Sequence, residues 1–220
     1  MTQLATEAPA DCPLCPRLVA YREANSVAEP DWFNGAVPSF LPDGGEEDVR
    51  LLIIGLAPGR GGANRTGRPF TGDWAGDLLY ATLIKFGLAS GAYDKRPDDG
   101  LTLHKVAITN AVRCVPPENK PVAAEINACK PFLKGRIEAL LNLKAILCLG
   151  KVSHDATLRT LGHRLAVSPF GHDTAYELEG PNGLLRVRSS YHCSRYNTNT
   201  GRLTDEMFET VVGACAEDIA

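Results

Sequence analysis

The chain has 220 residues, of which 44% are hydrophobic and 22% are charged, and its formal net charge is −3. This composition excludes a disordered or fibrous chain, and the length fits one large domain. No apolar run approaches the ~20 residues of a membrane-spanning helix, and residues 1–15 lack the basic start and apolar stretch of a secretory signal, so we expect a cytoplasmic protein with no membrane partner. The charge excludes a generally basic nucleic-acid coat but permits a local basic face.

Short aliphatic runs alternate with helix-compatible segments along the chain. Strands are predicted at 50–55, 104–110, 144–150 and 183–190, and helices at 73–86, 121–141, 152–161 and 203–216. The first three runs are mainly β-branched or aliphatic, as in strands buried on both faces of a parallel sheet. Pro121 suits the first turn of its helix, where no amide hydrogen is lost. The alternation predicts a three-layer α/β/α sandwich, a single domain over 1–220, with residues 29–48 as a surface loop.

A glycine-rich, basic segment follows the first predicted strand. Residues 55–73 read GLAPGRGGANRTGRPFTGD, and glycine lets backbone amides approach a ligand closely. Arg68-Pro69 replaces the Lys-Ser/Thr of a P-loop, and Asn64 replaces the third glycine of a dinucleotide fingerprint, so we expect no nucleotide cofactor. A flexible surface loop is the alternative. The side chains that suit phosphates, a planar ring and one charged catalytic group are Arg60, Arg65, Arg68, Phe70 and Asp73, the last also a candidate helix N-cap.

A second polar segment, SSYHCSRYNTNTGRLT at 189–204, follows the last predicted strand. A turn just before a helix is a natural phosphate site, and Arg186 and Arg188 add positive charge upstream. His192 is a candidate site residue, with a structural histidine as the alternative. A Cys193–His192 nucleophile pair has little weight because neighbouring strand residues point to opposite faces. The residues that suit contact with a DNA backbone or base stack are Ser194, Arg195, Tyr196, Asn197 and Arg202.

The seven cysteines, an odd number, argue against a complete disulfide framework. Cys12 and Cys15 form a CxxC pair, and Cys114 and Cys129 follow the second predicted strand. A thioredoxin-like redox pair is the alternative, but this CxxC precedes every predicted strand. The absence of a histidine beside any of the four favours an iron–sulfur cluster over zinc. The two remaining cysteines outside the polar segment are predicted to be buried apolar residues: Cys148 and Cys215.

Three long motifs in order, GLAPGRGGANRTGRPFTGD, VRCVPPENKP and SYHCSRYNTNTGRLT, resemble those of the family 5 iron–sulfur uracil-DNA glycosylases. The resemblance extends from Cys12 to about Met207. It implies an α/β/α sandwich around a four-stranded parallel sheet and a 4Fe–4S cluster with a structural role. The ligands that match the family are Cys12, Cys15, Cys114 and Cys129, so residues 1–28 would carry two of them.

The resemblance implies an enzyme of DNA repair that flips uracil, or another deaminated base such as hypoxanthine, out of DNA and hydrolyses its bond to deoxyribose. We expect a monomer that acts on DNA at the nucleoid. Asp73 would orient or deprotonate water and stabilise the positively charged sugar, a role favoured by Ala57 where related families carry an acidic or polar residue. His192 would donate to the base oxygen. The remaining implied contacts are backbone amides near Gly55 and Leu56, a stacking Phe70, and Asn119 against base or DNA.

Asn110 departs from the family, whose members often carry a small residue at the end of the second strand. Its amide could pair with uracil and narrow the range of bases, or it could stabilise the strand end. Two other functions stay open at this point. One is a noncatalytic module that binds damaged DNA, and the other is a redox or radical enzyme in which the cluster performs the chemistry.

Overall fold

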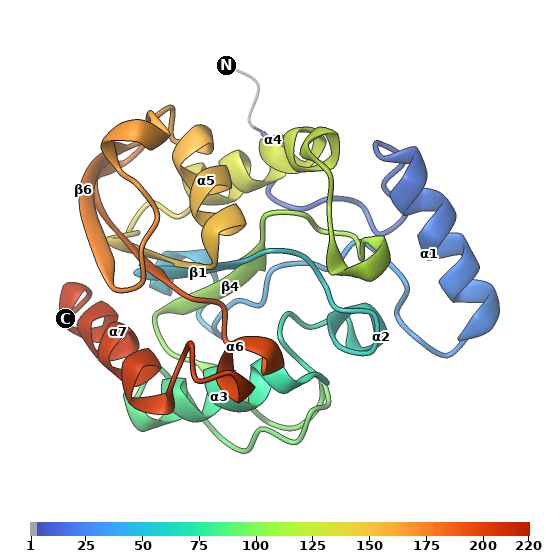
Figure 1. The fold of residues 1–220 in the computed structure, drawn as a ribbon, viewed down its shortest axis with the longest axis horizontal. Helices are drawn as coiled ribbons and strands as arrows, with labels where there is room; N and C mark the ends of the chain where they lie inside the picture. The colour runs from blue at the N-terminus through green and yellow to red at the C-terminus, as the bar shows by residue number, and fades with distance from the viewer. Residues whose placement is uncertain (1–3) are drawn as a thin grey trace.

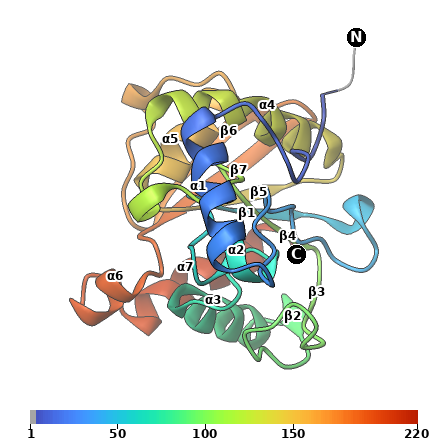
Figure 2. The same ribbon diagram turned by 90° about the vertical axis from the view of Figure 1, so that its right-hand side faces the viewer.

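The computed structural model describes residues 4–220, in which one central sheet lies between two layers of helices (Figures 1 and 2). The predicted domain begins at residue 1, and residues 1–3 lie outside the described residues. Across the sheet the strands follow the order β4 (Val106–Asn110), β1 (Leu51–Gly55), β5 (Ala145–Leu149), β7 (Gly183–Ser190) and β6 (Thr174–Gly180).

Four of these strands are parallel, as expected, because β4, β1, β5 and β7 pair in the same direction. The sheet is nevertheless mixed and five-stranded: β6 pairs antiparallel with β7, and the sequence prediction missed it. The two strands form a hairpin whose turn ends at Gly183, at a φ of 125° that favours glycine. A four-stranded sheet is therefore a correct description of the parallel part only.

All four predicted helices are present, with bounds that differ by one or two residues. They are α3 (Trp74–Lys85), α4 (Ala123–Ala139), α5 (Lys151–Thr160) and α7 (Asp205–Asp218). Pro121 lies outside α4, contrary to prediction, since the helix begins at Ala123 after Val122 as N-cap. The Glu125 carboxylate accepts a 2.8 Å hydrogen bond from the Val122 amide, which satisfies one of the free donors at this end.

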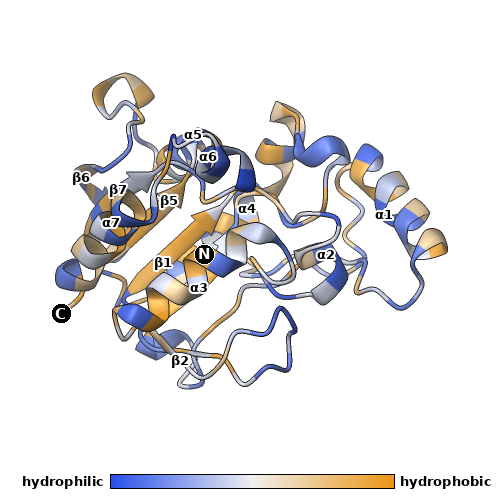
Figure 3. Ribbon diagram, turned by 60° about the horizontal axis from the view of Figure 1, so that its bottom comes forward, coloured by the Kyte–Doolittle hydropathy of each residue, from blue (hydrophilic) through white to orange (hydrophobic). Residues whose placement is uncertain are grey.

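Alternate residues of the strands face two separate hydrophobic cores. Helices α3 and α7 cover one face of the sheet, where Leu51 and Ile53 of β1 point, and α4 and α5 cover the other, where Leu52 and Ile54 point. Strands β1 and β5 are hydrophobic, and the helices around them carry both polar and hydrophobic residues (Figure 3). This arrangement confirms the three-layer sandwich and buries Cys148 and Cys215, as predicted.

Several shorter elements were not predicted. They are α1 (Pro16–Ala28), α2 (Ala63–Thr66), α6 (Arg195–Asn199), a hairpin of β2 (Ala89–Ser90) and β3 (Thr102–Leu103), and three 3-10 turns at Glu46–Asp48, Pro117–Asn119 and Leu165–Val167. Residues 29–48 are only partly a surface loop, since Ala36 and Val37 are buried and Phe40 pairs with Ile108 of β4. Within residues 4–220 no helix has the length and apolar character needed to cross a membrane.

Candidate functional site

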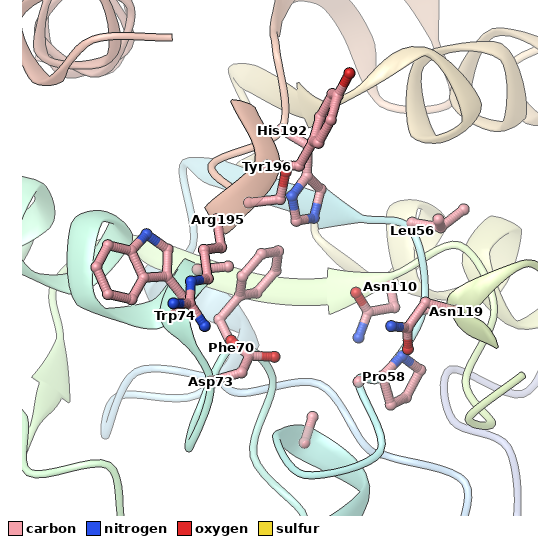
Figure 4. A pocket seen from close by; sticks show the side chains of 15 residues that line it. Leu56, Pro58, Phe70, Asp73, Trp74, Asn110, Asn119, His192, Arg195 and Tyr196 are labelled. Carbon is pink, nitrogen blue, oxygen red and sulfur yellow. The ribbon is translucent and has the colours of Figure 1, made fainter. Parts of the chain in front are cut away.

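A cavity of about 440 Å³ opens where β1, β4 and β7 end (Figure 4). The carboxyl ends of parallel strands meet at one edge of a sheet, which is where open α/β folds bind ligands. The glycine-rich segment after β1, the loops after β4 and the segment after β7 all contribute to its wall. Its lining residues are Leu56, Ala57, Pro58, Gly59, Ala63, Phe70, Asp73, Trp74, Ala75, Asn110, Asn119, His192, Ser194, Arg195 and Tyr196.

Asp73 supplies the one carboxylate that lines this cavity in the described chain. It occupies the N-cap position of α3, and its Oδ1 is buried without a hydrogen-bond partner. Burial raises the pKa of Asp73, and the backbone amides of Gly76 and Ala75 oppose that shift only in part. A Cβ on Gly62 would lie 2.3 Å from Oδ2, so the nearby backbone can approach the carboxylate only because this residue is glycine.

His192 lies just beyond the end of β7 and faces the same cavity. Its ring stacks on Phe70 with centroids 5.8 Å apart, and its Nδ1 is buried without a hydrogen-bond partner. Burial lowers the pKa of His192 to about 4, so the imidazole is neutral at neutral pH and one ring nitrogen still carries a proton to donate. The Asn197 side chain donates to the His192 carbonyl at 2.8 Å and fixes the backbone of this segment.

Phe70 is held in a backbone conformation that a bulky residue rarely adopts, with a φ of 52°. Two tyrosine hydroxyls stabilise this turn: Tyr93 donates to the Phe70 carbonyl at 3.1 Å, and Tyr80 donates to the Pro69 carbonyl at 2.5 Å. Burial raises the pKa of Tyr93 to about 12, so it remains a donor at neutral pH. Such strain is typical of functional sites, because surrounding contacts must hold it.

Asn110 ends β4 and Asn119 lies in the Pro117–Asn119 turn, and both line the side of the cavity opposite Trp74 (Figure 4). Asn110 is 4% exposed, whereas Asn119 is exposed and has a φ of 57°. Gly55 lies beneath them, and a Cβ there would be 2.4 Å from the Asn110 Oδ1 and 2.6 Å from the Phe70 Cζ. The carbonyl of Leu56 accepts from the Val112 amide at 3.0 Å, which fixes the start of the glycine-rich segment against the β4 loop.

The prediction that Arg68 contacts DNA phosphate does not agree with the structure. Its side chain is buried, and both terminal nitrogens donate to the Asp99 carboxylate at 2.9 and 2.7 Å. The Arg68 Nε donates to the Thr71 hydroxyl at 2.7 Å. The guanidinium therefore braces the turn around Phe70 and is not free to bind a phosphate.

The other arginines near the cavity differ in how far their charge is already paired within the protein. Arg60 lies 5.0 Å from the Trp32 ring centroid, hydrogen-bonds to Asn25 and pairs with Glu29 at 3.5 Å, so its charge is partly compensated. Arg65 binds the Gly61 carbonyl with its Nε. Arg186 and Arg188 are paired with acidic residues within the sheet region, Glu177 and Asp218, and so add nothing to the positive charge at the cavity.

The segment after β7 provides the clearest exposed surface at the cavity mouth. Tyr196 is 72% exposed, and the Arg195 guanidinium lies 5.6 Å from the centroid of the Trp74 ring. Ser194 is the N-cap of α6, where its hydroxyl accepts from the Asn197 amide. Arg202 is exposed and stacks 4.5 Å from the centroid of Tyr191. Of these predicted contacts, the cavity wall includes Ser194, Arg195 and Tyr196 but neither Asn197 nor Arg202.

The four predicted ligand cysteines surround one small cavity and form no disulfide. Cys12 and Cys15 precede α1, Cys114 follows β4, and Cys129 lies in α4. The Arg113 amide donates to the Cys129 Sγ at 3.3 Å. No three metal-binding side chains of residues 4–220 are grouped to hold a single ion. Burial raises the pKa of Cys129 to about 11, so without a metal this thiol would be protonated at neutral pH.

Two groups of functional residues were missed from the sequence. Trp74 lines the cavity although it was treated as part of a helix, and an exposed aromatic residue beside a candidate acid is the signal that could have found it. Tyr93 and Asp99, which brace the Phe70 turn, lie in the 91–101 region, far from any motif. No local sequence signal identifies them.

The profile of the uracil DNA glycosylase superfamily matches residues 42–215, and the chain belongs to this superfamily.

Within it, the similar relatives are named type-5 uracil-DNA glycosylases. The chain is 44% identical to the one from Thermus thermophilus over 207 residues, and this match covers 91% of this chain and 90% of the relative. It is 38% identical to the one from Pyrobaculum aerophilum over 94% of this chain and 89% of the relative, and 39% identical to the one from Mycobacterium bovis over 91% and 75%.

Proposed function

We propose that this chain excises uracil from DNA by hydrolysing the N-glycosyl bond, which leaves an abasic site. The observation that carries this proposal is the meeting of Asp73 and His192, from segments more than 100 residues apart, in one cavity at the carboxyl edge of the sheet. Family membership supports the reaction class. A cavity of about 440 Å³ has room for a single base and part of its sugar.

Breaking this bond leaves positive charge on the sugar and negative charge on the departing base. An enzyme lowers the barrier with preplaced groups at both ends. Asp73 acts at the sugar end: its carboxylate stabilises the cationic sugar and orients or deprotonates the attacking water. The unpartnered Oδ1 supports this role, because it leaves one buried carboxylate oxygen free to meet the sugar or the water.

His192 acts at the base end by donating a hydrogen bond to the base oxygen on which negative charge develops. Its lowered pKa makes it a neutral donor, which strengthens as the oxygen gains charge. The orphaned Nδ1 supports the assignment, since a structural histidine normally has partners on both nitrogens. His154 shows the contrast: both of its nitrogens bind neighbours, Ser189 at 2.7 Å and Ser168 at 2.9 Å.

The flipped base lies against Phe70 and is read by amide groups. Asn110, nearly buried at the cavity wall, can pair with the edge of uracil, and backbone amides near Gly55 and Leu56 assist. Asn119, on an exposed turn, contacts the base or the DNA beside it. Asn110 therefore favours uracil over other deaminated bases such as hypoxanthine.

DNA is held by the segment after β7. Tyr196 is positioned to enter the base stack, while Arg195 binds phosphate and Arg65 and Arg202 add positive charge nearby. Flipping costs on the order of a few kcal/mol, which such contacts offset. We propose a monomer acting on nucleoid DNA, with residues 1–220 as one domain.

A 4Fe–4S cluster fits the four-cysteine cavity, with Cys12, Cys15, Cys114 and Cys129 as its ligands. Arg22 provides the test of fit: it is buried, its Nη1 lies 3.8 Å from the Cys114 Sγ and 3.2 Å from the Cys12 carbonyl, and it pairs with no carboxylate of the described chain. A buried cation requires a negative partner, and metal-bound thiolates supply one. The cluster's role is structural, since its ligands join the N-terminal segment to the loop between Asn110 and Asn119.

The test is incubation with a uracil-containing oligonucleotide followed by alkali, which cleaves the strand at an abasic site. The proposal predicts strand cleavage that depends on uracil and is lost in Asp73→Asn. A noncatalytic binder would retain DNA affinity and leave the strand intact. A redox enzyme would show activity that follows the oxidation state of the iron, whereas hydrolysis is insensitive to reductant.

A further inference from the structure

Helices α3 and α6 are joined at the mouth of the cavity by one side chain, Trp74. Its indole Nε1–H donates to the Thr198 hydroxyl at 3.1 Å, across 124 residues of sequence, and the Arg195 guanidinium lies 5.6 Å from the centroid of its ring. Trp74 is 48% exposed, so burial in the core does not account for the placement of this large side chain.

Each end of this contact lies next to a proposed catalytic group. Trp74 directly follows Asp73 at the start of α3. On the other side, Thr198 belongs to α6, and its neighbour Asn197 donates to the His192 carbonyl at 2.8 Å. The Nδ1 of His192 has no hydrogen-bond partner, so the position of the ring depends on its backbone and on its stacking against Phe70. Anything that fixes α6 therefore also fixes His192.

We propose that Trp74 is a positioning residue that joins the two catalytic segments and holds Asp73 and His192 in the relative positions that excision requires. This inference rests on the proposed function. Trp74 does not read the base, because it lies on the far side of Phe70 and Asp73 from Asn110 and Asn119 (Figure 4). Since hydrolysis needs both groups placed around the same bond, loosening the link slows the chemical step more than it weakens DNA binding.

A double-mutant cycle in single-turnover uracil excision tests the link. Trp74→Phe keeps an aromatic face for Arg195 but removes the indole N–H, and Thr198→Val keeps the shape but removes the acceptor. Each change should slow excision about fivefold, and the double variant should also be about fivefold slower, because both remove the same hydrogen bond between α3 and α6. Thr198→Val also removes the donation of this hydroxyl to the Ser194 and Arg195 carbonyls within its own segment, a loss that the Thr200→Val control matches. The affinity for abasic-site DNA should change by less than about twofold. Thr198→Ser, which keeps the hydroxyl, should restore the rate.

Thr200→Val is the matched control. The Thr200 hydroxyl donates to the Tyr196 carbonyl at 2.8 Å within the same segment and does not reach α3. Its rate should stay within about twofold of the parent. The inference would be overturned if the single variants excised uracil at the parental rate. It would also be overturned if the double variant were about 25-fold slower, which is the product of two independent effects.

A second readout does not require activity. The chain has two tryptophans, so Trp32→Phe leaves Trp74 as the only indole emitter. In that background Thr198→Val should red-shift the emission and increase quenching by acrylamide, and Thr200→Val should do neither. Unchanged emission in Thr198→Val would overturn the link while leaving the proposed function intact. Parental protein that removes no uracil would instead overturn the proposed function, and the positioning role with it.

Discussion

Asp73 carries the catalytic charge in this account, and Asp73→Asn removes that charge with little change in shape. The amide keeps the packing against Gly59 and Gly62 and the position at the N-cap of α3. A carboxylate about 4 Å from the cationic sugar, at an effective dielectric constant of about 20, stabilises it by about 4 kcal/mol. At about 1.4 kcal/mol per tenfold, this corresponds to about a 10³-fold loss of rate.

The assay is single-turnover release of uracil from a labelled duplex, quantified after alkaline cleavage, beside the affinity for the same duplex. Asp73→Asn should lose about 10³-fold in rate and retain affinity. Asp77→Asn is the matched control, because Asp77 lies in the first turn of the same helix but pairs with Lys95 at 2.9 Å and is absent from the cavity wall. A rate for Asp73→Asn close to that of Asp77→Asn would refute the assigned role.

Three further outcomes follow from the site. Asn110→Ala should lower the ratio of uracil to hypoxanthine excision about tenfold, as one directional hydrogen bond is lost; a constant ratio would make Asn110 structural. The single-turnover rate should rise with pH as Asp73, whose pKa is raised, loses its proton. The rate should not fall as the pH passes about 6.5, because His192, with a pKa of about 4, is already neutral there. A loss of rate above that pH would indicate that a protonated, positively charged histidine is the donor. The Arg22→Met variant should lose iron to a chelator about tenfold faster than the parent, as measured by visible absorbance. Arg17 lies on the same helix and pairs with Glu125, so Arg17→Met should lose iron at the parental rate. Equal rates for the two variants would show that Arg22 does not stabilise the metal site.

Three strands of the parallel part, β1, β4 and β5, could be predicted because they are buried on both faces and are therefore mainly apolar. Strand β6 could not be found this way, since it is an edge strand and of its residues only Leu178 is buried. The Gly-Pro-Asn-Gly sequence at 180–183 was the available signal for its hairpin. Helix α1 was missed because its buried residues are Leu18, Arg22 and Asn25, two of them polar. A helix that faces a charged site has no hydrophobic stripe to detect.

The motif residues around the cavity could be predicted because the ends of parallel strands necessarily meet. The roles of individual arginines could not, because charge counted along the sequence does not show its partner in space. Arg68 was expected to bind phosphate, but it is neutralised by Asp99, 31 residues away. The partner lies in the hairpin region between α3 and β4, whose contacts depend on the tertiary fold.

An excision panel tests the central claim most directly: purified, cluster-containing protein, given in excess to single- and double-stranded DNA with uracil, hypoxanthine, xanthine or mismatched thymine. We expect uracil to be released fastest and each cut strand to carry an abasic site. Full occupancy of the DNA with every strand left intact would contradict the claim that this cavity is a hydrolytic site.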